Sequence, residues 1–423
     1  MFHSRARTSS PSRALAGILR IVCVAVLPGA GALIAQDRAP NDGPAVTDAS
    51  KDPFAKERLE ATVRHLAGES FEGRGFGTEG NARAAQWIAE RFEAIGLRPL
   101  GDGWFHEFKV GGKVGRNVIG VLEPTASASE GAWPHVLVAA HHDHLGRRGK
   151  AVYPGADDNG SGVASVLALA EWFARHPDGL RARLVFVSFD AEEKGLIGSR
   201  RFVQQATIDP ATIRFFLVFD LIGGTFVQGE EKNFYAFGSE HSPPLADIVG
   251  RAAKGSAITP RLLGTYLIEP AGPLFSRSDY QAFRSKKVPY LFFTTATPWY
   301  YHTPFDRPER LDFDKQSRIL HVARDVVHEI AKREEPLGFE FEGGASASDA
   351  RQVVQMLQRL VERREALALP ERLASTIADQ LAEAERIVAA AEPPGTTALD
   401  ERAKRHLQQC VISVLNAARR RPR

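Results

Sequence analysis

Four stretches of the sequence are apolar almost from end to end, and each leads into residues that can bind a metal or move a proton. A strand that is apolar on both faces must be covered on both, as in a parallel sheet flanked by helices. Segments with helical periodicity, at 78–95, 163–173 and 314–332, alternate with or flank these runs. The sequence therefore predicts an α/β fold with a mostly parallel central sheet between helix layers. The four apolar runs are 135–140, 183–189, 215–219 and 288–295.

Polar residues follow these runs directly or within a short loop. His141, Asp190 and Asp220 end the first three runs, and His302 follows the fourth. In open α/β sheets, ligands bind beyond the carboxyl ends of the strands. A parallel order would bring these side chains to one edge of the sheet, where we expect the functional site.

The first of these strand ends carries His141-His142-Asp143. Residues two apart on a strand face the same way, so Asp143 can accept a hydrogen bond from the His141 ring. That bond would leave the other ring nitrogen free for a metal. On its own the pair is a weak signal, because most short motifs of this kind do not bind metal.

Two pairs of adjacent carboxylates lie near the same predicted edge. Asp157-Asp158 occupies a glycine-bounded loop before a helix, where one carboxylate would suffice as a helix cap. Two adjacent carboxylates repel each other, and a cation would relieve that repulsion. In Glu192-Glu193, one side chain can bind a metal while the other acts as general base for a metal-bound water. Taken alone, each pair also fits a cap or a solvated acidic loop.

The remaining candidates are Asp220 and His302. Asp220 has apolar neighbours on both sides, and a buried carboxylate without a partner is costly. His302 lies in an aromatic loop and, taken alone, is typical of a packed residue. Together with His141, Asp158 and Glu193 they supply carboxylate oxygens with one imidazole per metal, a donor set that suits Zn²⁺.

Five sequence blocks resemble those of the M28 family of zinc peptidases and occur in the family's order, over residues 52–332. The blocks are HHDHLG (141–146), GADDNGSG (155–162), AEEKGLIGS (191–199), FDLIG (219–223) and YHTPFD (301–306). The resemblance implies two zinc ions per chain. His141 and Asp220 would hold one ion. Glu193 and His302 would hold the other, with Asp158 bridging the two.

The resemblance also implies supporting roles and an activity. Glu192 would be the general base and acid, and Asp143 would orient His141. The peptide bond after Asp158 is often cis in the family. The implied enzyme is an exopeptidase that hydrolyses N-terminal amino acids from peptides by means of a metal-bridging water. A carboxypeptidase, a glutaminyl cyclase and a non-catalytic binding protein on the same fold are the alternatives.

Some features of the substrate site are left open by the sequence. Tyr280, Tyr300 and Tyr301 are each able to donate a hydrogen bond to a reaction intermediate, or to serve in packing only. We expect the pocket that selects the substrate side chain to be built from loops such as 262–278. The sequence of these loops does not indicate which side chain is preferred.

The chain is predicted to have five parts: a signal peptide (1–35), a disordered leader (36–51), a peptidase domain (52–336), a linker (337–348) and a helical C-terminal extension (349–423). Arginines followed by an apolar run and small residues favour the signal peptide, and hence a secreted or periplasmic protein without a stable membrane span. Without the signal peptide Cys410 is the only cysteine, so cysteines cannot build the metal site. The formal net charge of +3, without a basic block in the middle of the chain, does not indicate nucleic acid as a partner. The expected partner is a peptide substrate.

Overall fold

The structure is a computed structural model that describes residues 52–125, 133–227, 229–269, 278–340, 345–391, 399–418 and 420. The predicted signal peptide and leader, the middle of the predicted linker at 341–344, and the part of the expected pocket loop at 270–277 lie outside the described residues. No helix of the described segments is long and apolar enough to cross a lipid bilayer.

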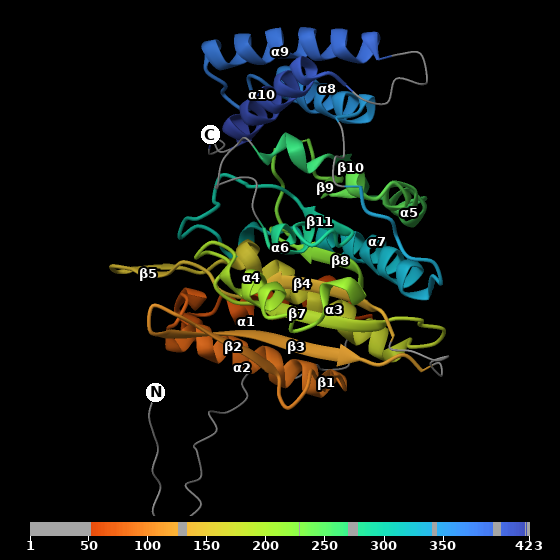
Figure 1. Cartoon of the computed structure of the whole chain (residues 1–423). Helices are drawn as coiled ribbons and strands as arrows, with labels where there is room; N and C mark the ends of the chain where they lie inside the picture. Colours follow the sequence, from red (N-terminus) through yellow and green to blue (C-terminus); the bar gives the residue numbers. More distant parts are fainter. Residues whose placement is uncertain are drawn as a thin grey trace, which may run out of the picture. The chain divides into compact units, whose positions relative to one another are not determined.

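Four parallel strands form the centre of the sheet (Figure 1). Their order across the sheet is β7-β4-β8-β11, and each neighbouring pair is parallel. Their carboxyl ends therefore lie at one edge, as the sequence predicts. The bounds are β4 His135–His141, β7 Arg183–Phe189, β8 Ile213–Phe219 and β11 Tyr290–Thr294.

The outer parts of the sheet are mixed. On one side β3 (Lys113–Leu122) runs antiparallel to β7 and pairs antiparallel with both β1 (Arg98–Pro99) and β2 (Phe105–Val110). On the other side β9 (Asn233–Phe237) is antiparallel to β11 and parallel to β10 (Thr259–Leu263). The parallel order that apolar runs indicate thus holds for the centre of a mixed sheet. A separate hairpin joins β5 (Gly146–Arg148) to β6 (Ala151–Tyr153).

Helices cover both faces of the sheet, because the central strands are apolar on both. In β4, Val136 and Val138 belong to the hydrophobic core on one face, and Leu137 and Ala139 to the core on the other. The first core contains α1 Lys56–Leu66, α2 Glu79–Ile95, α3 Gly162–Arg175, α5 Pro244–Ala252 and α7 Phe313–Lys332. The second contains α4 Ile197–Gln204 and α6 Tyr280–Arg284.

Local capping explains where the predicted helices begin and end. The Thr78 side chain accepts a hydrogen bond from the Asn81 N–H at the start of α2, and Gly96 ends that helix with φ 92°. At the start of α7, Asp312 accepts from the Lys315 N–H at 2.9 Å. The two helices therefore lie within a residue or so of the segments that periodicity predicts.

The C-terminal extension is helical, as predicted, and consists of α8 Ala347–Glu362, α9 Glu371–Ala390 and α10 Glu401–Ala418. Ser346 and Asp349 form a capping box at the start of α8. Apolar residues of all three helices join the second core, including Leu357 of α8 and Val411 of α10. The extension is therefore continuous with the hydrophobic core on that face of the sheet.

Candidate metal centre

Two groups of potential metal ligands meet at the carboxyl edge of the sheet and share Asp158. The first group is His141, Asp158 and Asp220. His141 ends β4 and Asp220 follows β8 directly. The His141 Nε2 atom lies 3.3 Å from Asp158 Oδ1 and 3.5 Å from Asp220 Oδ1. Three donor atoms from three segments thus lie within 4.8 Å of one another, close enough to contact one ion together.

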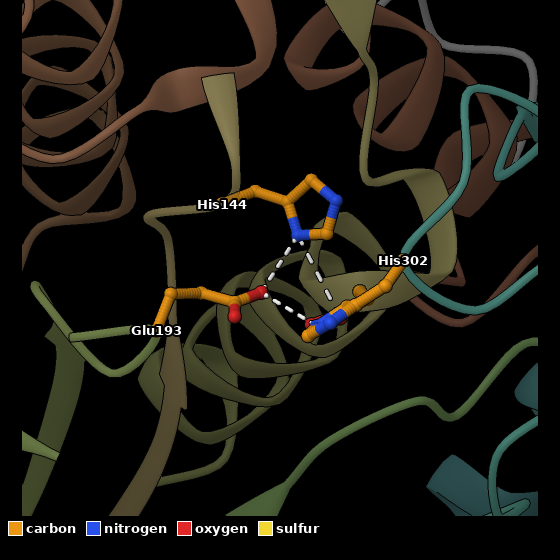
Figure 2. Close-up of side chains that lie close together, drawn as sticks. His144, Glu193 and His302 are labelled. Carbon is orange, nitrogen blue, oxygen red and sulfur yellow. Dashed lines mark hydrogen bonds and ion pairs between the residues drawn. The ribbon is translucent and has the colours of Figure 1, made fainter. Parts of the chain in front are cut away.

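The second group is His144, Asp158, Glu193 and His302. The His302 Nε2 atom lies 3.1 Å from Asp158 Oδ2 and 3.1 Å from Glu193 Oε1. Figure 2 shows the side chains of His144, Glu193 and His302 pointing toward one another from separate loops. All five predicted ligands therefore lie in the two groups. Asp158 Oδ1 is near His141 of the first group, and Asp158 Oδ2 is near His302 of the second.

The donor atoms of both groups fit a cation. Within the described residues, His141 Nε2, both ring nitrogens of His144 and Asp158 Oδ2 are buried and make no hydrogen bond. Buried polar atoms without partners are costly, and carboxylates with imidazoles are donors that zinc accepts. Burial opposes the charged form of His302, but the neighbouring carboxylates of Asp158 and Glu193 raise its pKa to about 10. The site is thus electronegative enough to favour a positive ion.

Hydrogen bonds to the backbone hold the loop that carries Asp158 in place. Asp306 accepts hydrogen bonds from the N–H groups of Asp157 and Asp158, at 2.7 and 3.0 Å. The peptide bond between Asp158 and Asn159 is cis, as the family resemblance implies. Gly155 at the start of the loop has φ 60°, and a Cβ there would lie 2.3 Å from the Asp158 carbonyl oxygen. The loop therefore needs glycine at this position.

The neighbouring Asp157 has a different role from Asp158. Its Oδ1 atom accepts from the Gly223 N–H at 2.8 Å, and its Oδ2 atom accepts from the Tyr300 hydroxyl at 3.1 Å. Burial raises the pKa of Asp157 to about 7. Asp157 thus ties the loop that carries Asp158 to the loops that carry Asp220 and His302. The Tyr300 hydroxyl is engaged in that contact.

Asp143 supports both His141 and the glutamate pair. The nearest acceptor for His141 Nδ1 is the carbonyl oxygen of Asp143 at 3.1 Å, while the carboxylate lies at 3.6 Å. The sequence predicts a bond to the carboxylate. In the structure that carboxylate instead accepts from the N–H groups of Glu192 and Glu193, at 2.9 and 3.2 Å. Asp143 therefore orients His141 mainly through its backbone.

Glu192 belongs to neither ligand group, but its electrostatic neighbours include members of both. Burial raises the pKa of its carboxyl well above the usual range, and the nearby His141 works against that rise. Its other electrostatic neighbours include Asp220 and Glu193. Glu192 is therefore a carboxyl group beside the potential metal ligands and outside both groups of them.

Three residues at this edge adopt backbone angles that L-residues rarely take. Ala191, directly before Glu192, has φ 57°, and so do Leu221 after Asp220 and His302 itself. Strain of this kind concentrates at functional sites, where the surrounding structure holds it in place.

A family model for peptidase family M28 matches residues 117–327. This range includes every residue of the candidate metal centre named so far. This part of the chain belongs to peptidase family M28.

Curated relatives of this M28 chain include several aminopeptidases. The probable lipoprotein aminopeptidase LpqL of Mycobacterium tuberculosis is 33% identical over 41% of this chain and 33% of its own length. Aminopeptidase YwaD of Bacillus subtilis is 24% identical over 55% of this chain and 49% of its own length. The chain thus spans between a third and a half of these two relatives.

Solved structures share the fold of the M28 domain. The LapA aminopeptidase of Legionella pneumophila superposes with a TM-score of 0.53 at 20% identity, covering 67% of this chain and 72% of that one. BSAP, a zinc aminopeptidase from Bacillus subtilis, gives 0.53 at 16% identity, covering 69% and 99%. At these identities the likeness establishes the fold alone.

His144 of the M28 domain is a potential ligand that sequence reasoning did not single out. Its buried Nδ1 atom lies 2.9 Å from Glu193 Oε1 and 3.6 Å from Asp158 Oδ2. Its ring packs edge-on against that of His302, with centroids 5.7 Å apart. The one signal in the sequence is its place in the block HHDHLG, three residues after His141. His142, in contrast, makes its ring contact with the Ser188 hydroxyl at 3.0 Å.

Arg74 is a second residue whose role the sequence did not disclose. It is fully buried, and its Nε donates to the carbonyl oxygen of His142 at 2.8 Å. Its two Nη atoms donate to the carbonyls of Leu66, Pro154 and Gly155 at 2.7, 2.8 and 2.7 Å. Burial lowers its pKa to about 10, so the guanidinium stays charged at neutral pH. Arg74 thereby joins the loop after β4 to the loop of Asp158.

Proposed function

We propose that the chain is a zinc-dependent aminopeptidase with two metal ions per chain. The observation that carries the proposal is the shared Asp158, whose two oxygens lie 3.3 Å from His141 Nε2 and 3.1 Å from His302 Nε2. The names of its M28 relatives support the activity. A carboxylate between two ligand groups is the arrangement of hydrolytic two-metal sites.

The residues divide the metal binding between them. His141 and Asp220 would hold one zinc ion. Glu193 and His302 would hold the other, and Asp158 would contact both. When bound, the two ions would activate a water as nucleophile and polarise the peptide carbonyl.

Glu192 moves the proton in this proposal. Its carboxylate takes a proton from the attacking water and returns it to the nitrogen of the leaving amine. Asp143 sets the position of Glu192 by holding its N–H at 2.9 Å. Asp157 and Asp306 keep the Asp158 loop in place during the reaction, since both bond to backbone groups of the surrounding loops.

The test is a panel of substrates offered to the zinc-loaded protein: aminoacyl-arylamides, N-blocked peptides, and peptides that begin with glutamine. We expect release of arylamine from the unblocked aminoacyl substrates. Cleavage of blocked substrates only would indicate a carboxypeptidase or endopeptidase and would contradict the proposal. Cyclisation of N-terminal glutamine without hydrolysis would indicate a glutaminyl cyclase, and no turnover at all would favour a binding protein.

We also infer that the enzyme acts outside the cytoplasm. The predicted signal peptide at 1–35 supports this location, and one relative is named a lipoprotein. Expression of the full chain in a bacterial host, followed by fractionation, tests it. Recovery of the shortened protein in the periplasm or medium is expected, whereas full-length protein in the cytosol would contradict the inference.

A further inference from the structure

An apolar pocket opens beside the candidate metal centre. Asp220, a proposed zinc ligand, is part of its wall, and so is Tyr301, whose ring stacks on that of His302 at 3.8 Å. Its empty space, open mouth included, is about 690 Å³.

The lining of the pocket favours apolar groups. Its walls include Phe226, Phe237, Leu263, Leu267, Ile268 and Phe292. Among the described lining residues there is no lysine or arginine, and Asp220 is the only carboxylate. Tyr235 and Thr297 bring hydroxyl groups that are buried and make no hydrogen bond within the described part of the chain. An acidic side chain would find no positive partner in this lining.

Two helices of the C-terminal extension form one side of this pocket. Met356 of α8 and both Val411 and Leu415 of α10 line it. All three residues lie beyond 117–327, the range that matches the family model. The wall they provide is therefore a feature of this chain's own extension.

Polar contacts fix the extension beside the pocket. The Gly264 N–H donates to Asp349 Oδ1 at 2.8 Å, and Gln408 Nε2 donates to the Tyr266 carbonyl at 2.9 Å. Arg261 donates to Gln355 Oε1 at 2.7 Å while its guanidinium also pairs with the buried Glu230 at 2.9 Å. Because these contacts hold both α8 and α10, the wall has a defined position relative to β10.

We propose that α8 and α10 are part of the active site, where they form a wall of the pocket that receives the side chain of the substrate's N-terminal residue. The pocket selects large apolar side chains such as those of leucine, methionine and phenylalanine. This inference rests on the proposed aminopeptidase activity. The reacting carbonyl of an aminopeptidase substrate belongs to the N-terminal residue, so that residue's side chain is the group next to the metals and within reach of the pocket.

Two valines of α10 give a matched pair of variants. Val411 and Val414 are 3% and 2% exposed, and both belong to the same core, but only Val411 lines the pocket. Val411→Ala removes two methyl groups from the wall and enlarges the pocket. We expect the ratio of kcat/KM for phenylalanyl- over leucyl-arylamide to rise roughly 10-fold, because missing methylene groups in a pocket change discrimination on that scale. Val414→Ala should leave the ratio unchanged while losing similar stability.

A filled pocket should give the opposite result. Val411→Phe is expected to reduce kcat/KM for both large substrates by a larger factor than for alanyl-arylamide, and circular dichroism with a thermal melt shows that the variant is folded. An unchanged ratio in Val411→Ala, or an equal change in Val414→Ala, would overturn the proposed wall.

The proposed pocket wall can be tested even if the proposed aminopeptidase activity is wrong. If the wild type hydrolyses no aminoacyl-arylamide, the proposed function is wrong and the pocket is tested by calorimetric titration with L-leucine and glycine. Stronger binding of leucine than of glycine, abolished in Val411→Phe, would support an apolar pocket bounded by α10. Equal binding of the two amino acids would overturn it.

Discussion

At the scale of single residues, the site separates adjacent side chains of the same type into different roles. Asp158 faces both ligand groups, whereas Asp157 bonds to Gly223 and Tyr300. Glu193 is a potential ligand, whereas Glu192 stands beside the ligands. The backbone fixes this division, because adjacent residues in a turn point in different directions.

The glutamate pair gives a direct prediction. Glu192→Gln should lower kcat by about 10²–10⁴-fold, the usual contribution of a general acid or base, and should leave the zinc content unchanged. Glu193→Gln is the matched variant and should lose zinc together with activity. Steady-state kinetics and metal analysis of both proteins make the comparison. Near-normal turnover by Glu192→Gln would refute its role as base.

His144 gives a second prediction. His144→Phe keeps a ring against His302 but removes both nitrogens near Glu193 and Asp158. We expect zinc affinity to fall about 10–100-fold, as for residues that support metal ligands. Competition with a chelator measures the affinity. His142→Phe is the control, since His142 contacts Ser188 and should leave affinity unaltered; equal affinities in all three proteins would contradict a role for His144.

At the scale of secondary-structure elements, the carboxyl ends of β4, β7 and β8 deliver His141, the glutamate pair and Asp220 to one edge. This could be predicted, because an apolar run shows where a buried strand ends. The roles of Arg74 and Asp306 could not, since each acts on backbone groups of distant segments that leave no pattern in the sequence. The same holds for the carbonyl contact of Asp143.

Arg74 provides a prediction at this scale. Arg74→Met would leave three buried carbonyl groups without a donor, since the fourth, that of Gly155, also accepts from the Gly160 N–H. Each unsatisfied group costs about 1–3 kcal/mol. The free energy of unfolding should therefore fall by about 3 kcal/mol or more, measured by urea denaturation of the zinc-loaded protein. Arg83→Met serves as control, because the Arg83 side chain is 46% exposed and its loss should cost less than about 1 kcal/mol. A similarly small fall in the free energy of unfolding of both variants would argue against this structural role of Arg74.

At the scale of the whole molecule, the chain combines an M28 domain with a helical extension that completes a pocket. The helical character of 349–423 could be predicted from the spacing of apolar residues such as Val353, Leu357 and Leu360. Which surface these residues cover could not be predicted, because periodicity identifies an apolar face and does not identify its partner. The mixed edges of the sheet are a similar case, since an apolar run does not state the direction of its neighbour.

We propose that Asp158 joins two metal sites in one chain, and zinc stoichiometry tests this most directly. The wild-type protein, saturated with zinc and freed of excess metal, should contain about two ions per chain, as expected of a two-metal hydrolase. Asp158→Asn should lose zinc from both groups, because both use its carboxylate. One zinc ion or fewer per saturated wild-type chain would contradict a two-metal site bridged by Asp158.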